Sequence, residues 1–332
     1  MKKLLIAGLI ASAGLVLGAA DAAAEKPAAA AKPEGEQAEL TERSDKPWSV
    51  GLDVPFYTAY VWRNALSSDR PIAQPILWGR LEFLEVLSLG GYVAQNYDLT
   101  NRRRNCGYRG EWNEHDYGLY LGATAWQSDD EAEKLTFEFG NEWYTYNIYG
   151  EWDDGARRRK SCPSTYELYV KSSFENPFVT PYVQCSWEVM AINGFSVNGG
   201  LQKTQALSDL FDSEDELLSK LSWSFDWNVN GGSGKYLSFL YSPRYSTYRG
   251  DDGEEYYDTS MHGHGIGGTT FKVGLSYAPC DNFSIGLVGA YTAILNERVG
   301  ESVRDAHDLG GGPDCLDHEQ LVWGGIEMHL TF

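Results

Sequence analysis

Charged side chains recur at every second position of many segments in this 332-residue chain, whose formal net charge is -20. In the final segment, Glu327 and His329 alternate with Ile326, Met328 and Leu330. Because successive side chains of an extended strand point to opposite faces, such charges would share one face. The same alternation places these candidate residues on polar strand faces: Asp53, Arg63, Arg80, Glu82, Glu138, Glu142, Glu167, Lys171, Glu188, Asp226, Lys272, Glu327 and His329.

Carboxylates outnumber bases in this set. If these residues line a water-filled path, their fixed charge would concentrate cations and repel anions. The competing interpretation is structural, because charges of both signs on facing walls of a narrow barrel can pair across it and fill it. The sequence leaves both interpretations open.

Catalytic and metal-binding patterns are weak. Barrel enzymes that cut lipids need a Ser and a His on neighbouring strands, and none of the six histidines lies in a recognisable nucleophile pattern. His262 and His264 lie in a Gly-rich segment without a third ligand, which is a poor zinc site. We therefore expect no enzyme, no cofactor and no metal.

Five cysteines are present, and two of them could form a loop disulfide. Cys106 and Cys162 are expected in neighbouring external loops, where an oxidising compartment would allow them to pair. Cys315 could replace either partner, and the sequence does not choose among the pairings. Cys185 is expected to face lipid and to be unpaired.

Basic runs beside Cys106 and Cys162 could bind lipopolysaccharide phosphates, or could be solvated loop surface.

Twelve segments have the alternation of amphipathic strands and predict an all-β fold. They are 48–63, 74–84, 86–98, 114–126, 134–147, 164–174, 178–190, 195–206, 221–229, 269–278, 282–295 and 321–332. The segment 235–248 also has strand-like composition, and we interpret it as a hairpin within a long loop. Counting further strands there would give fourteen instead of twelve.

The connections between these segments are short on one side and mostly long on the other. Short turns fall at 85, 128–133, 175–177, 207–220 and 279–281, whereas the other side receives connections such as 99–113, 230–268 and 296–317. This asymmetry is typical of a transmembrane antiparallel up-and-down β-barrel, with periplasmic turns and external loops. Residues 47–332 would form the barrel.

The two ends of the chain agree with export to the bacterial outer membrane. Residues 1–24 have a basic start, an apolar stretch and a small-residue cleavage site, as in a secretory signal peptide. Residues 25–46 are rich in Ala, Glu, Lys and Pro and predict a flexible periplasmic linker. The chain ends on Phe332, within a strand that would pair with 48–63 and close the barrel. Closing strands recognised by the barrel assembly machinery end in this way.

The sequence Tyr60-Val61-Trp62-Arg63-Asn64, followed by Pro71-Ile72-Ala73-Gln74-Pro75, resembles the opening hairpin of the TorF-type porin family, which carries Tyr-x-x-Arg-Gly. Asn64 stands where that family has Gly, and both residue types tolerate a left-handed turn. The resemblance implies passive transport of small solutes. Arg63 is either a charge at the external mouth or a turn residue that pairs with a carboxylate.

These observations predict an outer-membrane porin-like channel with an acidic, cation-preferring lumen. The alternative is a filled structural or adhesin-type barrel that acts through its external loops. Expected partners are outer-membrane lipid, lipopolysaccharide, small solutes and the barrel assembly machinery, and not nucleic acid.

Overall fold

The protein is described by a computed structural model. The described residues are 47–68, 71–84, 86–99, 113–146, 150–151, 159–160, 164–190, 192–241, 247–249, 255–257, 263–296 and 320–332. The predicted signal peptide (1–24) and linker (25–46) lie outside them. So do Cys106, Cys162 and Cys315 and most of the two basic runs.

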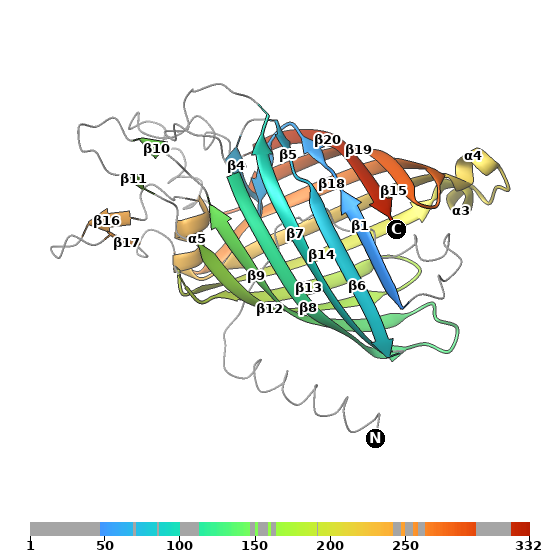
Figure 1. Ribbon diagram of the computed structural model, residues 1–332, viewed down its shortest axis with the longest axis horizontal. Helices are drawn as coiled ribbons and strands as arrows, with labels where there is room; N and C mark the ends of the chain where they lie inside the picture. Colours follow the sequence, from blue (N-terminus) through green and yellow to red (C-terminus); the bar gives the residue numbers. More distant parts are fainter. Residues whose placement is uncertain are drawn as a thin grey trace, which may run out of the picture.

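Within these ranges, twelve long antiparallel strands close a barrel (Figure 1). They are β1 (Trp48–Asp53), β6 (Ile76–Leu84), β7 (Leu87–Asp98), β8 (Asn113–Gln127), β9 (Lys134–Tyr146), β12 (Thr165–Glu175), β13 (Thr180–Glu188), β14 (Gly194–Ala206), β15 (Leu221–Gly232), β18 (Gly265–Cys280), β19 (Phe283–Ile294) and β20 (Gln320–Thr331). Each strand pairs with its neighbour in sequence order, and β1 pairs with β20. The predicted fold class is confirmed.

The closing pair has the predicted partners. Asp53 lies opposite His329 in the β1–β20 ladder, and Phe56 lies opposite Ile326 farther along the same ladder. Between them, Pro55 interrupts the strand because proline has no N–H to donate. The chain resumes as β2 (Phe56–Tyr57), and β5 (Ile72–Ala73) likewise precedes Pro75 and β6. These two short strands prolong the first two barrel strands, so the described barrel has twelve strands and not fourteen.

Beyond β2 the first strand leaves the barrel wall. Tyr60–Trp62 (β3) and Ala65–Ser68 (β4) form a separate two-stranded hairpin, here named the inward hairpin. Tyr60 and Trp62 continue the apolar alternation of the predicted strand 48–63, opposite Asp53 and Arg63, so a straight strand would turn them toward lipid, and this interpretation is wrong. Both side chains are buried, because the hairpin folds into the barrel.

The segment after β15 also differs from its prediction. Residues Gly234–Tyr241 form helix α5, where the strand-like composition of 235–248 predicted a hairpin. The helix begins beside Ser233, whose hydroxyl accepts a hydrogen bond from the Tyr236 N–H, as an N-cap does. A short hairpin follows from β16 (Thr247–Arg249) and β17 (Glu255–Tyr257). The pair β10 (Gly150–Glu151) and β11 (Arg159–Lys160) lies in another long connection.

The short-turn end of the barrel carries compact connections. Helices α3 (Leu207–Phe211) and α4 (Glu216–Ser219) join β14 to β15. In the β8–β9 turn, the Ser128 hydroxyl donates to Asp130 at 2.6 Å, and this bond lowers the pKa of the Asp130 carboxyl. No helix among the described residues is long and apolar enough to cross a membrane.

Large apolar side chains cover the outside of the barrel. Leu77, Leu119, Trp187, Phe271 and Leu287 are all exposed, although they lie on widely separated strands. A continuous apolar belt of this kind is stable only against lipid. The opposite face of each strand points into the barrel interior, so the functional residues must be sought there.

Candidate functional site: the barrel interior

The tip of the inward hairpin is the two-residue turn Arg63-Asn64 between paired Trp62 and Ala65. Its φ angles are 50° and 61°, and positive values at both central residues are characteristic of type I′ hairpin turns. Asn tolerates this conformation, whereas a left-handed Arg costs about 1–2 kcal/mol. Interactions of the Arg63 side chain must offset that cost.

The Arg63 guanidinium is buried and bound by three strands of the far wall. It makes a two-pronged ion pair with Glu167 on β12, one bond being 2.9 Å long. It also donates to Tyr144 on β9 at 3.3 Å and to Ser196 on β14 at 3.4 Å. Two roles were predicted for Arg63, and the structure shows the second one. Arg63 is a turn residue that pairs with a carboxylate.

Further contacts fix the hairpin to other parts of the wall. The Tyr60 hydroxyl donates to Glu114 on β8 at 2.8 Å. The Asn64 amide donates to the Gly268 carbonyl on β18 at 3.2 Å and accepts from the Thr270 hydroxyl at 2.6 Å. Because these partners lie on the inner faces of well-separated strands, the hairpin must cross the barrel interior.

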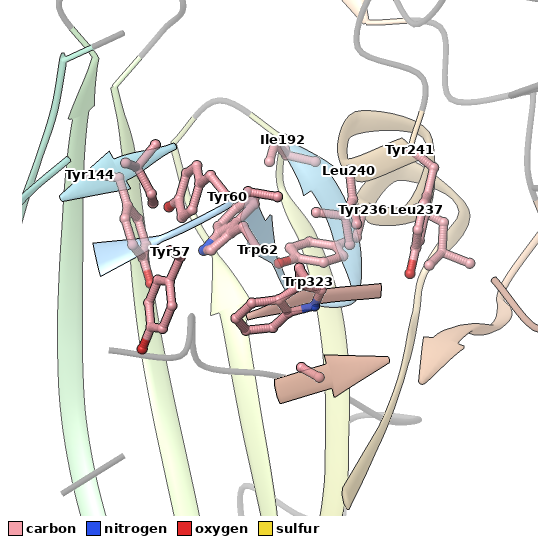
Figure 2. Packing of buried hydrophobic residues seen from close by; sticks show 14 residues of the cluster. Tyr57, Tyr60, Trp62, Tyr144, Ile192, Tyr236, Leu237, Leu240, Tyr241 and Trp323 are labelled. Atoms are coloured by element: carbon pink, nitrogen blue, oxygen red, sulfur yellow. The ribbon is translucent and has the colours of Figure 1, made fainter. Parts of the chain in front are cut away.

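Apolar and aromatic side chains surround the hairpin at the long-loop end. The cluster contains Tyr57 of β2 and Tyr60 and Trp62 of the inward hairpin. They pack with Tyr144, Trp323 and the buried face of α5. Figure 2 shows Trp62, Tyr236 and Trp323 together, with Tyr144 on one side and Leu237 and Tyr241 on the other. The Arg63 guanidinium lies 4.7 Å from the Trp62 ring centroid and 5.3 Å from that of Tyr236, within cation–π range. This half of the interior is occupied.

Carboxylates gather on β8 and β9 beside the hairpin. The predicted residue Glu142 is fully buried, and its carboxylate accepts from Tyr92 at 3.0 Å and from Tyr144 at 2.6 Å. Glu114 and Asp116 are also buried there, and the sequence analysis did not include them. The alternation that points Leu119 and Leu121 outward could have found them, because it places residues 114 and 116 on the inner face.

Farther toward the short-turn end, opposite charges pair along the wall. Lys272 donates to Glu327 at 2.6 Å, and the Tyr57 hydroxyl donates to the same carboxylate at 2.5 Å. His329 Nδ1 lies 3.0 Å from Asp53 across the β1–β20 closure. The structure therefore brings these predicted residues together at the closing strand.

The remaining inner-wall residues form a mixed band. Asp226 lies opposite Lys272 and accepts from Tyr182 at 3.2 Å, while the Lys171 ammonium lies 5.7 Å from the Tyr182 ring centroid. Glu138 lies opposite Lys171 and accepts from Tyr169 at 2.6 Å. Positive and negative side chains alternate around this part of the wall.

Three predicted residues lie away from the central interior or have a local role. Arg80 and Glu82 are 3.5 Å apart near the short-turn end, where the Glu82 side chain is 65% exposed. Glu188 accepts backbone N–H bonds from Met190, Ile192 and Asn193, at 2.9, 2.5 and 2.9 Å. It therefore orders the turn that follows its own strand.

Cysteine and metal chemistry adds little within the described ranges. Cys185 and Cys280 are free thiols, as expected for Cys185. The proposed disulfide partners Cys106, Cys162 and Cys315 fall outside these ranges, as does His262. Among the residues that the structure describes, no group of three or more His, Cys, Asp or Glu side chains could hold a metal ion.

A closed barrel with an apolar exterior and a polar, partly occupied interior is an outer-membrane β-barrel protein, located in the bacterial outer membrane. No protein-family model matches the sequence, and no curated protein sequence matches it.

Solved structures with a similar fold are outer-membrane barrels. An outer-membrane channel from Pseudomonas putida F1 has 9% identity and a TM-score of 0.43 over 87% of this chain and 97% of that one. KdgM porin has 8% identity and a TM-score of 0.39 over 86% and 99%. Outer membrane phospholipase A from Escherichia coli has 13% identity and a TM-score of 0.37 over 85% and 92%. At these identities the likeness concerns the fold alone.

The expectation that the chain is not an enzyme needs correction. Outer membrane phospholipases from Escherichia coli and Salmonella typhi, which are enzymes, are among the similar structures. Porins and enzymes therefore share this architecture, and the barrel fold does not exclude catalytic activity.

Proposed function

We propose that the protein is a porin-like outer-membrane channel for passive diffusion of small solutes, constricted by the inward hairpin and selective for cations. The observation that carries this proposal is the sign of the inner-wall charge. Among the described inner-wall residues, carboxylates such as Asp116, Glu142 and Asp226 outnumber Arg63, Lys171 and Lys272. Fixed negative charge along a narrow path raises the local cation concentration.

The resemblance to the TorF-type porins supports the same proposal. The Tyr-x-x-Arg-Gly motif of that family corresponds here to Tyr60 to Asn64, which forms the first half and tip of the inward hairpin. Asn64 has a φ of 61°, a conformation that Gly also adopts readily. The motif therefore coincides with the element that would narrow the path.

The proposal also assigns roles to the two ends of the chain and orients the barrel in the outer membrane. Residues 1–24 would be a signal peptide, 25–46 a periplasmic linker and 47–332 the barrel. The short-turn end would be periplasmic, and the long loops would meet lipopolysaccharide. Phe332 would be recognised by the barrel assembly machinery. If Cys106 and Cys162 pair, their disulfide would join two external loops.

A second candidate function is a filled barrel that acts through its external loops. The buried cluster of Trp62, Tyr236 and Trp323 favours it, because tightly packed aromatic side chains leave little room for water. The two candidates differ in whether ions cross the barrel.

Planar-bilayer recording of the refolded protein in a KCl gradient separates them. We expect small conductance steps and a reversal potential that favours K⁺ over Cl⁻. Replacing residues 59–70 by a short Gly-Ser turn between Thr58 and Pro71 should give larger steps, because Tyr57 and Ile72 already pair and can hold the shortened connection.

The same replacement at residues 212–214, between α3 and α4 at the opposite end, is the control and should leave the steps unchanged. Wild-type protein that conducts in neither polarity would contradict the channel proposal and favour the filled barrel. Steps that favour Cl⁻ would contradict the cation preference while leaving the channel in place.

A further inference from the structure

The inner-wall carboxylates differ in whether a base neutralises them. Glu327 is bound by Lys272 and Glu167 is bound by Arg63, whereas Asp226 lies opposite the same Lys272. Glu327 and Glu167 contribute little net charge to a passing ion, because each is paired with a positive side chain on the same wall or on the hairpin.

Among the described residues, no base forms an ion pair with Asp116 or Glu142. The hydrogen-bond donors to Glu142 are the neutral hydroxyls of Tyr92 and Tyr144. Asp116 is only 6% exposed, and its Oδ1 has no hydrogen-bond partner in the described part of the chain. A buried carboxylate without a partner is costly, so this position favours an incoming positive charge.

The hydrogen bonds of Arg63 go to other residues. Its two terminal nitrogens are directed to Glu167, Tyr144 and Ser196. Glu114, Asp116 and Glu142 all lie on the β8–β9 wall beside the inward hairpin. Buried carboxylates are therefore more crowded on this wall than in the band nearer the short turns, where carboxylates lie beside lysines.

We propose that Asp116 and Glu142 form the cation-binding position of the channel, and that they set its selectivity for monovalent cations. The role in selectivity rests on the proposed function, whereas cation binding at this position can be tested without measuring conduction.

The first measurement is the reversal potential of single variants in a KCl gradient. Asp116→Asn and Glu142→Gln each remove one negative charge with little change in size, and should lower the ratio of K⁺ to Cl⁻ permeability severalfold toward unity. The matched control is the double variant Lys272→Met/Glu327→Gln, which removes both charges of an ion pair, leaves the net charge of the wall unchanged, and should change that ratio less. A larger effect for this double variant, or no effect for Asp116→Asn, overturns the inference.

The second measurement is the urea unfolding midpoint in KCl and in N-methyl-D-glucamine chloride of equal ionic strength. A cation that binds only the folded state raises stability with its concentration. Wild-type protein and the double variant Lys272→Met/Glu327→Gln should unfold at higher urea in KCl, and Asp116→Asn should lose that difference. If wild-type protein shows no K⁺ stabilisation, the binding position is wrong. If K⁺ stabilises a protein that does not conduct, the binding position stands and the channel proposal fails.

Discussion

Arg63 shows how one side chain can decide the state of the barrel interior. Its backbone has a left-handed conformation that disfavours Arg, and its charge is buried against Glu167. A buried ion pair of this kind contributes specificity of position more reliably than net stability, because removing two charges from water is expensive. Removing one partner of the pair should destabilise the folded barrel, because the other charge then remains buried alone.

At this scale we predict strong coupling between the two residues. Arg63→Met and Glu167→Gln should each destabilise the folded barrel by about 3–5 kcal/mol, as expected when a buried partner is lost. The double variant should be less destabilised than the sum of the two, because neither charge is then left alone. Urea unfolding in detergent measures all four proteins of this cycle. Additive effects would show that the pair does not act as a unit.

Strands β7 and β8 show how the sheet itself shapes the interior. Gly118 lies opposite Tyr92, and a side chain added at Gly118 would meet the Tyr92 ring, which covers that position. The same Tyr92 donates to Glu142. The absence of a side chain at one strand position therefore lets its neighbour direct a hydroxyl at a candidate ion-binding residue.

At this scale we predict that Gly118→Val is destabilising by about 1–3 kcal/mol, the usual range for forcing extra atoms into a packed site. Gly289→Val is the matched control, because an added side chain there meets nothing within 4 Å. Its urea midpoint should stay near that of wild type. Equal losses in both variants would mean that the Tyr92 contact does not determine the effect, because Val has a higher strand propensity than Gly and propensity alone would not lower stability.

The whole molecule depends on closure between its first and last strands. Gly51 and Leu52 pair with Thr331 and Leu330, and the Phe332 N–H donates to the Val50 carbonyl at 2.9 Å. These are backbone interactions, so closure requires the chain to reach its end but does not require the Phe332 side chain. An unclosed barrel would expose strand edges in lipid, which is unfavourable.

At this scale we predict that removal of residues 324–332 abolishes heat-modifiable migration on an SDS gel after refolding in detergent, because the ladder that joins β20 to β1 and β2 is lost. Phe332→Ala keeps the backbone bonds and should remain heat-modifiable. If Phe332→Ala fails to fold in detergent, its side chain has a structural role that the backbone bonds do not explain.

Alternation determined the polar face of most strands, because side-chain direction in a strand follows from the local backbone geometry. Glu142, Lys171, Asp226 and Glu327 lie on inner strand faces for that reason. The lengths of the connections indicated which strand ends are joined by short turns and which by long loops. The antiparallel partner of the last strand was also predictable, because a closed barrel has no free edges.

Only the tertiary structure decided the direction of the chain after Thr58. Tyr60 and Trp62 continue the alternation of the first strand, so no local signal separates a hairpin that prolongs the wall from one that folds inward. Its position depends on Arg63 meeting Glu167 and on Asn64 meeting Thr270, more than one hundred and two hundred residues away in the chain. The sequence by itself therefore determined an antiparallel barrel. The non-local contacts of one hairpin decided how the barrel interior is occupied.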